Sequence, residues 1–319
     1  MEAWVRRLAV LATIVMFIVL IMGSTVTNTG SADGCGHSWP LCHGKFVPAY
    51  TVKTAIELSH RAVTGVETFL ILGTAAGALW YRRRQRGVKV LSGLMVGTLF
   101  LQAGMGAAAV MWPQKPVILS THFGISLACF ASVFLVARLL YQPFRSAGRY
   151  GAVGPKPGHP AWFRYATWGA LGASIGVSYL GAYMRHSGNE IACSTWPGCN
   201  GQVYPGFAGP EGIAFAHRAA AGLCMALVAA LAVSAYRRRG ADPAMFRATG
   251  AALLFIGMQA LIGGAVVLTR LELWSTLAHS GMMALLFIAL ADACRQVMPR
   301  REPSALPRVA LAQAPGSAD

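Results

Sequence analysis

Apolar residues gather along the chain into eight long stretches, which short polar segments separate. The stretches cover roughly residues 8–28, 57–80, 90–112, 117–141, 164–184, 211–236, 246–268 and 272–294. Each is long enough, at about 20 residues, to cross the hydrocarbon core of a bilayer as an α-helix. Arg6 and Arg7 precede the first stretch as in a signal peptide, but its length and the weak cleavage site after it favour a retained helix. The pattern therefore predicts an all-α integral membrane protein with eight transmembrane helices.

The eight predicted helices form two copies of one four-helix unit. A loop with two cysteines around a Trp-Pro pair occupies residues 35–42 and returns at 193–199, and a His-Arg pair lies in the helix after each loop. Residues that match at an offset of 157 are Trp39 and Trp196, His60 and His217, Gln102 and Gln259, and His122 and His279. Because each copy has an even number of spans, we expect two tandem four-helix bundles that are parallel and related by a pseudo-twofold axis along the membrane normal.

The predicted boundaries divide the chain into two halves, a linker and a tail. Residues 1–141 form the N-terminal half, and 164–298 form the C-terminal half. Between them, 142–163 is a cytoplasmic linker rich in Arg, Pro and Gly. The tail at 299–319 is rich in Pro, Ala and Ser, a composition that predicts disorder.

Composition and charge agree with a membrane location. Of the 319 residues, 55% are hydrophobic and 12% are charged, whereas a soluble domain carries about a quarter charged residues. The net charge of +16 would suggest nucleic-acid binding on a soluble face. Here, however, 20 of the 27 Lys and Arg residues fall on the N-terminal side of the predicted membrane. This bias predicts that both termini are cytoplasmic and that nucleic acid is not a partner.

Four of the seven cysteines lie in predicted external loops, where disulfides form and persist. These are Cys35 and Cys42 in one loop, and Cys193 and Cys199 in the other. Each pair could staple a small loop around its Trp-Pro turn or exchange with an external thiol–disulfide protein, and the structural role is favoured. Cys129, Cys224 and Cys294 fall within helices, where they are expected to pack as small apolar residues.

Four histidines lie within the first turns of helices that start outside: His60, His122, His217 and His279. They are therefore expected at one depth, in the outer leaflet, where ionisable residues mark functional sites. A lone zinc or copper ion usually needs a third or fourth ligand, whereas two imidazoles inside a helix bundle suit a heme. Two repeats then predict two heme sites, and the absence of a Cys-x-x-Cys-His motif argues against covalent attachment.

Charged residues near these histidines add two hypotheses. Arg61 and Arg218 follow a histidine directly, so they are candidates for contacts with heme propionates or for snorkelling anchors. Glu57 lies three residues before His60 and shares its helical face, while its counterpart is Ala214. An acid at a helix start can simply favour the helix dipole, but beside only one histidine pair it also marks one site for proton transfer.

A second membrane acid, Glu67, lies two turns beyond His60. Its residue type permits a proton path, and hydrogen bonding in the helix core is the favoured expectation.

The chain resembles the heme A synthase family, in its bacterial eight-helix type with a cysteine pair in both the first and third external loops. The resemblance covers nearly all of residues 1–295. It rests on the two cysteine loops, on the segment from Glu57 to Arg61, and on His122, His217-Arg218 and His279.

This resemblance implies an oxidoreductase that converts the C8 methyl group of heme O into the formyl group of heme A, by successive hydroxylations, for terminal oxidases. It places heme B as cofactor in the C-terminal half, on the iron ligands His217 and His279. It places the substrate heme in the N-terminal half, on His60 and His122, with Glu57 as the catalytic acid.

The resemblance also implies two disulfides, Cys35–Cys42 and Cys193–Cys199, and an association with heme O synthase. The location it implies is the bacterial cell membrane, with lipid around the helices. Whether the chain forms a homo-oligomer is left open.

Two other functions use the same residues. A di-heme transmembrane cytochrome b, which passes electrons from quinol, would need the four histidines but no acid beside one pair. A heme or metal transporter would need alternating access and broken helices at mid-membrane, whereas the histidines here cluster on one side.

Overall fold

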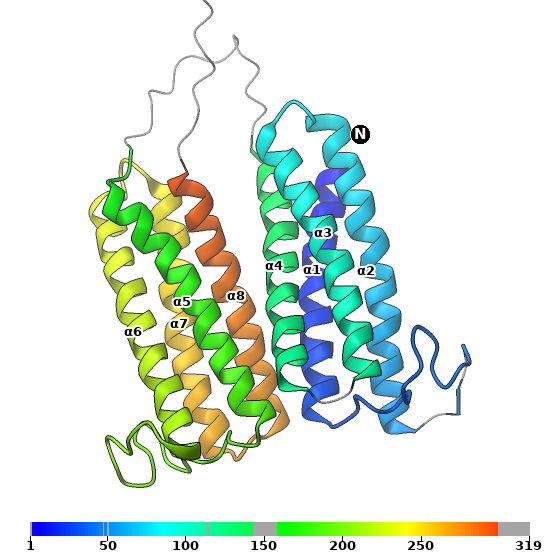
Figure 1. Cartoon of the computed structure of the whole chain (residues 1–319). Coiled ribbons are helices and arrows are strands. Elements are labelled where there is room, and N and C mark those ends of the chain that lie inside the picture. The colour runs from blue at the N-terminus through cyan, green and yellow to red at the C-terminus, as the bar shows by residue number, and fades with distance from the viewer. Residues whose placement is uncertain (1, 47, 50, 113–114, 143–157, 299–319) are drawn as a thin grey trace, which may run out of the picture.

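Eight long α-helices run alternately up and down through the described part of the chain (Figure 1). The computed structural model describes residues 2–46, 48–49, 51–112, 115–142 and 158–298. The helices are α1 (Glu2–Asn28), α2 (Val52–Arg82), α3 (Arg86–Met111), α4 (Pro116–Leu140), α5 (Ala161–His186), α6 (Gly209–Arg237), α7 (Pro243–Leu268) and α8 (Leu273–Val297). Most of the predicted linker, 143–157, and the predicted tail, 299–319, lie outside the described residues.

The helices confirm the prediction of an all-α, multi-pass membrane protein. Seven of the eight described helices are long and apolar enough to cross a bilayer. The remaining helix, α5, has 26 residues but is less apolar, because Gly, Ser and Tyr occur along it. Several helices extend beyond the predicted apolar stretches: α1 begins at Glu2, and α8 ends at Val297. Their ends carry polar residues, so hydrophobicity alone places the boundaries a few residues too far inside.

Local signals in the sequence start and stop these helices. Thr51 caps α2, since its side chain accepts a hydrogen bond from the backbone N–H of Thr54 at 3.1 Å. Asp242 caps α7 in the same way. Gly30 and Gly188 follow α1 and α5 with φ angles of +60° and +72°. This left-handed conformation, which glycine adopts without strain, lets the chain leave the helix.

The helices form two groups of four, α1–α4 and α5–α8, which stand side by side (Figure 1). They meet where α1 and α4 contact α8, and where α4 contacts α5. As a result α4 and α8 are the most enclosed of the seven apolar helices. In their most apolar stretch 61% of the residues are buried, against 17–28% in the other five of these helices. Polar contacts also join the groups: the Oγ atoms of Ser24 and Ser280 lie 2.8 Å apart, and Arg138 pairs with Asp292 at 3.3 Å.

Contacts between the groups recur at matching positions. A Cβ atom at Gly124 in α4 would meet Tyr179 of α5, and one at Gly281 in α8 would meet Ile21 of α1. Each glycine lies two residues after one of the four histidines. The predicted pseudo-twofold axis agrees with this recurrence and stays a prediction.

The buried side chain of Arg82 links three helices at the end of the α1–α4 group where the chain begins. The Arg82 side chain is 1% exposed and forms an ion pair with Glu2 of α1. It also donates to the carbonyl oxygens of Leu139 and Leu140 at 3.0 Å and of Gln142 at 2.8 Å. These carbonyls belong to the end of α4, where a helix leaves acceptors free and favours a cation. Arg82 thus joins α1, α2 and α4.

We expect Arg82→Ala to destabilise the protein by about 3 kcal/mol, since it leaves several carbonyls without their donor and leaves Glu2 with Arg6 as its remaining partner. The matched control is Arg239→Ala at the corresponding position of the second repeat. Arg239 is exposed, covers the ring of Tyr236 and donates one solvent-exposed hydrogen bond to the carbonyl of that residue at 3.1 Å, so its loss should cost less than about 0.5 kcal/mol. Unfolding of the purified protein in detergent measures both, and equal losses would contradict the role given to Arg82.

Candidate functional site

The four histidines lie at one level, near the end of the bundle that carries the cysteine loops. Each belongs to an even-numbered helix: His60 to α2, His122 to α4, His217 to α6 and His279 to α8. They follow the first residue of their helix by six or eight positions, which corresponds to about 9–12 Å of helical rise. The structure therefore places the four histidines that the sequence singled out at the same level of the helices.

Each imidazole packs against a glycine of the neighbouring odd-numbered helix. The pairs are His60 with Gly23, His122 with Gly106, His217 with Gly181, and His279 with Gly263. A Cβ atom at these glycines would lie 3.3, 3.5, 2.8 and 3.1 Å, respectively, from Cε1 of the ring. Glycine lets two helices approach closely enough to clamp the ring between them. These four glycines therefore fix where each histidine can sit.

The histidines act as two pairs, one in each group of helices. His60 and His122 are close enough for an electrostatic interaction, and so are His217 and His279. The Nδ1 atom of every one of these rings is buried without a well-aligned hydrogen bond to a described residue, and the backbone of Gln102, Val177 and Gln259 lies near the rings of His122, His217 and His279, respectively. Gln259 lies beside one pair, with its Nε2 atom 3.2 Å from Nε2 of His279. Leaving a buried polar atom unpaired costs roughly 1–3 kcal/mol, so these rings suit a ligand that engages nitrogen.

The donor set fits a heme better than a lone metal ion. Within the described ranges, no group of three or more His, Cys, Asp and Glu side chains could hold a metal ion. Two imidazoles suffice for a heme, because its macrocycle supplies the other four nitrogens. Each histidine pair therefore fits one heme.

Glu57 is buried one turn before His60, directly beneath the first cysteine loop. One carboxylate oxygen accepts the backbone N–H of Cys35 at 2.8 Å, and the other accepts Nη2 of Arg61 at 2.5 Å. Only 5% of its side chain is exposed. In the second repeat Ala214 takes this place and is also buried. The structure thus holds a paired carboxylate one turn before His60, where the matching position before His217 is an alanine.

Arg61 and Arg218 fasten the two cysteine loops to their histidine helices. Arg61 donates through Nη1 to loop carbonyls, the nearest being that of Ser38 at 2.9 Å. Arg218 does the same in the second loop. Its Nη2 atom donates to the carbonyl of Cys193 at 3.2 Å, whereas the Nη2 atom of Arg61 meets Glu57. Both arginines therefore have structural partners, and their contact with heme propionates stays a prediction.

Each cysteine loop is closed by a disulfide. Cys35 is bonded to Cys42, and Cys193 is bonded to Cys199. Both loops contain a cis Trp-Pro bond, and each has a left-handed residue directly after its second cysteine. That residue is His43 in the first loop, and its ring lies 3.0 Å from the carbonyl that precedes Cys35. The two loops thus share one construction.

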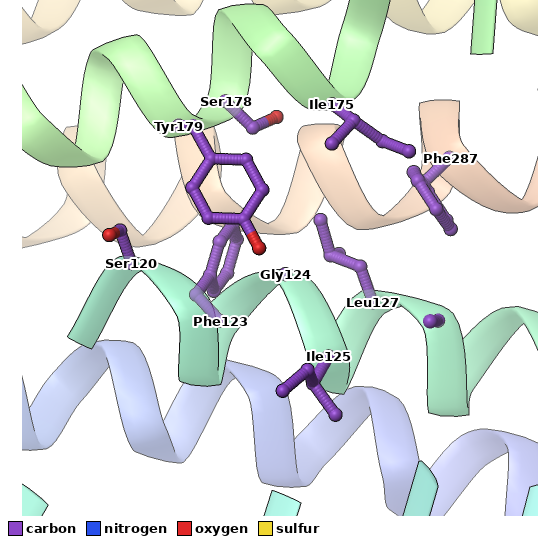
Figure 2. A pocket seen from close by; sticks show the side chains of 10 residues that line it. Ser120, Phe123, Gly124, Ile125, Leu127, Ile175, Ser178, Tyr179 and Phe287 are labelled. Atoms are coloured by element: carbon purple, nitrogen blue, oxygen red, sulfur yellow. The ribbon is translucent and has the colours of Figure 1, made fainter. Parts of the chain in front are cut away.

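A cavity of about 180 Å³ lies between the two groups of helices rather than between paired histidines (Figure 2). It is lined by α4, α5 and α8, and its walls are mostly apolar. Figure 2 shows the ring of Tyr179 lying over Gly124, where a Cβ atom would come within 2.8 Å of Cζ. None of the four histidines lines this cavity. It belongs to the junction between the repeats.

Comparison with known proteins settles the family. Residues 49–291 match the family described as Cytochrome oxidase assembly protein. The heme A synthase of Symbiobacterium thermophilum is 36% identical to the chain, over 92% of this chain and 95% of that protein. The heme A synthase of Bacillus licheniformis is 38% identical, over 90% and 94%. The chain belongs to the heme A synthase family. The resemblance seen in the sequence is therefore confirmed.

The span that matches the family includes the whole histidine site, since Glu57 and all four histidines lie within residues 49–291. Sequence reasoning missed the glycines behind the imidazoles. Gly106 and Gly263 were visible as matching positions of the repeat, but which side chain faces them depends on how the helices are rotated. It also missed the loop carbonyls that Arg61 and Arg218 bind.

Thiol counting tests the cysteine arrangement. We expect the native, unreduced protein to react with a maleimide at no cysteine, since four are bonded and Cys129, Cys224 and Cys294 are buried. Unfolding without reductant should expose those three thiols, and unfolding with reductant should expose all seven. Mass spectrometry assigns the labels. Labelling of Cys35 or Cys42 in native, unreduced protein would contradict the disulfide.

Proposed function

We propose that this chain oxidises the C8 methyl group of heme O, by successive hydroxylations, to the formyl group of heme A, which terminal oxidases use. Its membership in the heme A synthase family supports this reaction. The observation that carries the proposal is an asymmetry: two histidine pairs lie at one level, and a buried carboxylate accompanies only one of them.

The N-terminal half is proposed as the substrate site. His60 and His122 would hold the iron of heme O, and the glycines behind their rings would fix the orientation of the imidazoles. Glu57, one turn away, is the proposed catalytic acid. Its carboxylate can take up or release a proton close to the substrate, since each hydroxylation of a methyl group changes the number of protons at the site. Its bonds to Cys35 and Arg61 keep it in place.

The C-terminal half is proposed as the cofactor site. His217 and His279 would hold heme B, which supplies reversible one-electron transfer when bound. Ala214 offers no proton-transferring group there, as expected for a heme that is not modified. Gln259, beside His279, is placed to orient that ring. Arg61 and Arg218 lie one residue beyond their histidines and are proposed to contact heme propionates in addition to their loop carbonyls.

We also propose an orientation of the protein in the membrane and a set of binding partners. The arginine clusters at the ends of α2 and α6 lie on the side of the N-terminus, which supports cytoplasmic termini in the bacterial cell membrane. The histidines and disulfides then lie near the external face. Heme O synthase would deliver the substrate, lipid surrounds the helices, and an external thiol–disulfide protein could reach both loops. A homo-oligomer is compatible with this arrangement.

A di-heme cytochrome b that leaves its hemes unmodified is the alternative function. It would use the four histidines equally well. It gives no reason for a buried acid in one repeat where the other has alanine, and the named relatives do not favour it.

The proposed reaction is tested by producing the protein together with heme O synthase and separating the extracted hemes by chromatography. We expect heme A and its hydroxylated precursor from the native chain. Glu57→Gln keeps an acceptor for the Cys35 N–H but removes the charge and the exchangeable proton, so heme A formation should fall by about 100-fold or more. Heme B content should not change.

Glu272→Gln serves as the matched control, because Glu272 is an exposed acid at the start of α8 on the same side. Its heme A output should equal that of the native chain. A native chain that yields only unmodified hemes would support the cytochrome. Native-level heme A formation by Glu57→Gln would refute the catalytic role of Glu57 and leave the rest of the proposal intact.

The division between cofactor and substrate site is tested by heme B content per chain, measured as the pyridine hemochrome. His217→Ala should lose heme B, whereas His60→Ala should keep it. Gly181→Ala should weaken heme B binding by about tenfold, because the added Cβ would displace the ring of His217. Gly176→Ala, on the same helix with no atom near the added Cβ, is the control. Equal losses from His60→Ala and His217→Ala would refute the division.

A further inference from the structure

A row of buried polar side chains continues along α2 beyond His60. Glu67 and Thr74 follow at seven-residue steps, so all three lie on one face of the helix. Each step carries the row about 10 Å further from the histidine level. Glu67 is 1% exposed and Thr74 is 0% exposed. The row therefore runs through the interior of the N-terminal half toward the Arg-rich end.

The polar atoms of this row have no partners among the described residues. Both carboxyl oxygens of Glu67 and the hydroxyl of Thr74 are buried without a hydrogen bond. The adjacent helix α3 adds Ser92 and Gln102, whose Oγ and Oε1 atoms are also unpaired. The core hydrogen bond expected for Glu67 is thus absent from the described structure, which corrects that expectation.

Thr74 and Ser92 are exceptions within this protein. Every other buried serine or threonine in the described ranges has a hydrogen bond, in most cases to a carbonyl three or four residues earlier in its own helix. Thr167 is typical, at 2.7 Å from the carbonyl of Phe163. A hydroxyl that forgoes this bond in a membrane costs free energy unless another group engages it.

The second repeat lacks the row along its histidine helix, and of the neighbouring groups only Gln259, the match of Gln102, also has a buried Oε1 atom without a partner. The positions that match Glu67 and Thr74 are Cys224 and Leu231 in α6, both buried. The match for Ser92 is Thr249, whose hydroxyl bonds to the carbonyl of Met245 at 2.9 Å. The row is therefore a feature of the half that we propose as the substrate site.

The charge state of Glu67 follows from its surroundings. The nearby thiol of Cys129 in α4 offers no positive charge, and no Lys, Arg or His forms an ion pair with Glu67 in the described structure. An unpaired carboxylate at this depth would cost far more than a neutral carboxyl group. Buried water, which typically makes about three hydrogen bonds, commonly engages polar atoms of this kind.

We propose that Glu67, Thr74 and Ser92 line a hydrated passage within the N-terminal half, through which Glu67 passes protons between the Arg-rich end of α2 and α3 and the histidine site. Thr74 lies about 12 Å from the end of α2, and Ser92 lies about 9 Å from the start of α3. The two hydroxyls are thus at a similar depth on helices that contact each other. Protons would enter the passage at the depth of these two hydroxyls, and Glu67 lies between that depth and His60.

The use of this passage rests on the proposed function. Hydroxylation of a methyl group with water as oxygen source removes two electrons and releases two protons. With dioxygen as source, two electrons and two protons enter and one water leaves. Either route moves protons at the histidine site, and a neutral carboxyl group that gives one proton and receives another remains unchanged overall. The existence of the passage does not depend on the reaction.

Infrared spectroscopy of the purified protein in lipid tests the passage without any heme chemistry. We expect the C=O stretching band of a neutral carboxyl group that disappears in Glu67→Gln. On transfer to D₂O this band should shift as the carboxyl proton exchanges. Thr74→Val and Ser92→Ala should slow the exchange by about tenfold, the factor that loss of one hydrogen bond typically costs. Thr249→Ala, which removes the matched hydroxyl in the second repeat, should leave the exchange rate unchanged.

Heme A formation provides the second readout. Glu67→Gln, and Glu67→Cys with the residue of the second repeat, should lower it by about 100-fold at unchanged heme B content. The proposal is overturned if the band is absent, if exchange is equally fast in Thr74→Val and Ser92→Ala, or if both Glu67 variants form heme A at the native rate. A native chain that forms no heme A would instead refute the proposed function, while the exchange measurement would still decide whether the passage exists.

Discussion

The hydrocarbon core of a membrane offers no hydrogen bonds, and this constraint applies to every polar group buried within the membrane-spanning helices. Backbone groups are satisfied inside helices, and most buried hydroxyls return to a carbonyl of their own helix. Arg82 is buried only because an acid and three carbonyls surround it. Against this background, an unpaired polar atom is informative, since it marks a place where another molecule completes the bonding. The four histidine rings and Glu67 are such places.

The two repeats share a scaffold and differ in what it encloses. Both cysteine loops are closed by a disulfide and held by an arginine of the histidine helix. Both histidine pairs are clamped by glycines of the neighbouring helices. The interiors differ: Glu57 and Glu67 are replaced by Ala214 and Cys224. A duplicated scaffold therefore presents two similar histidine pairs, while acids at these two positions of the histidine helix occur in one copy alone.

The sequence predicted the features that depend on residue type and spacing. Eight apolar stretches and the offset of 157 were enough to place the helices and to match His60 with His217. Features that depend on how helices rotate against each other were not predictable. The clamp of Gly181 on His217 is one example, because nothing in the spacing says which residues face each other. The missing partner of Glu67 is another, since only packing shows that no donor reaches it.

Two acids bracket His60 on α2, and their settings differ in a way that suits different tasks. Glu57 lies toward the loop, and Arg61 and the N–H of Cys35 hold its carboxylate in position. Glu67 lies on the opposite side, with no positive charge paired to it. A carboxylate bonded through both oxygens keeps its position, whereas an unpaired carboxyl group is free to exchange its proton with a water molecule. The stretch of α2 around His60 therefore combines a carboxylate held in position on the loop side of the histidine with an unpaired carboxyl group on the other side.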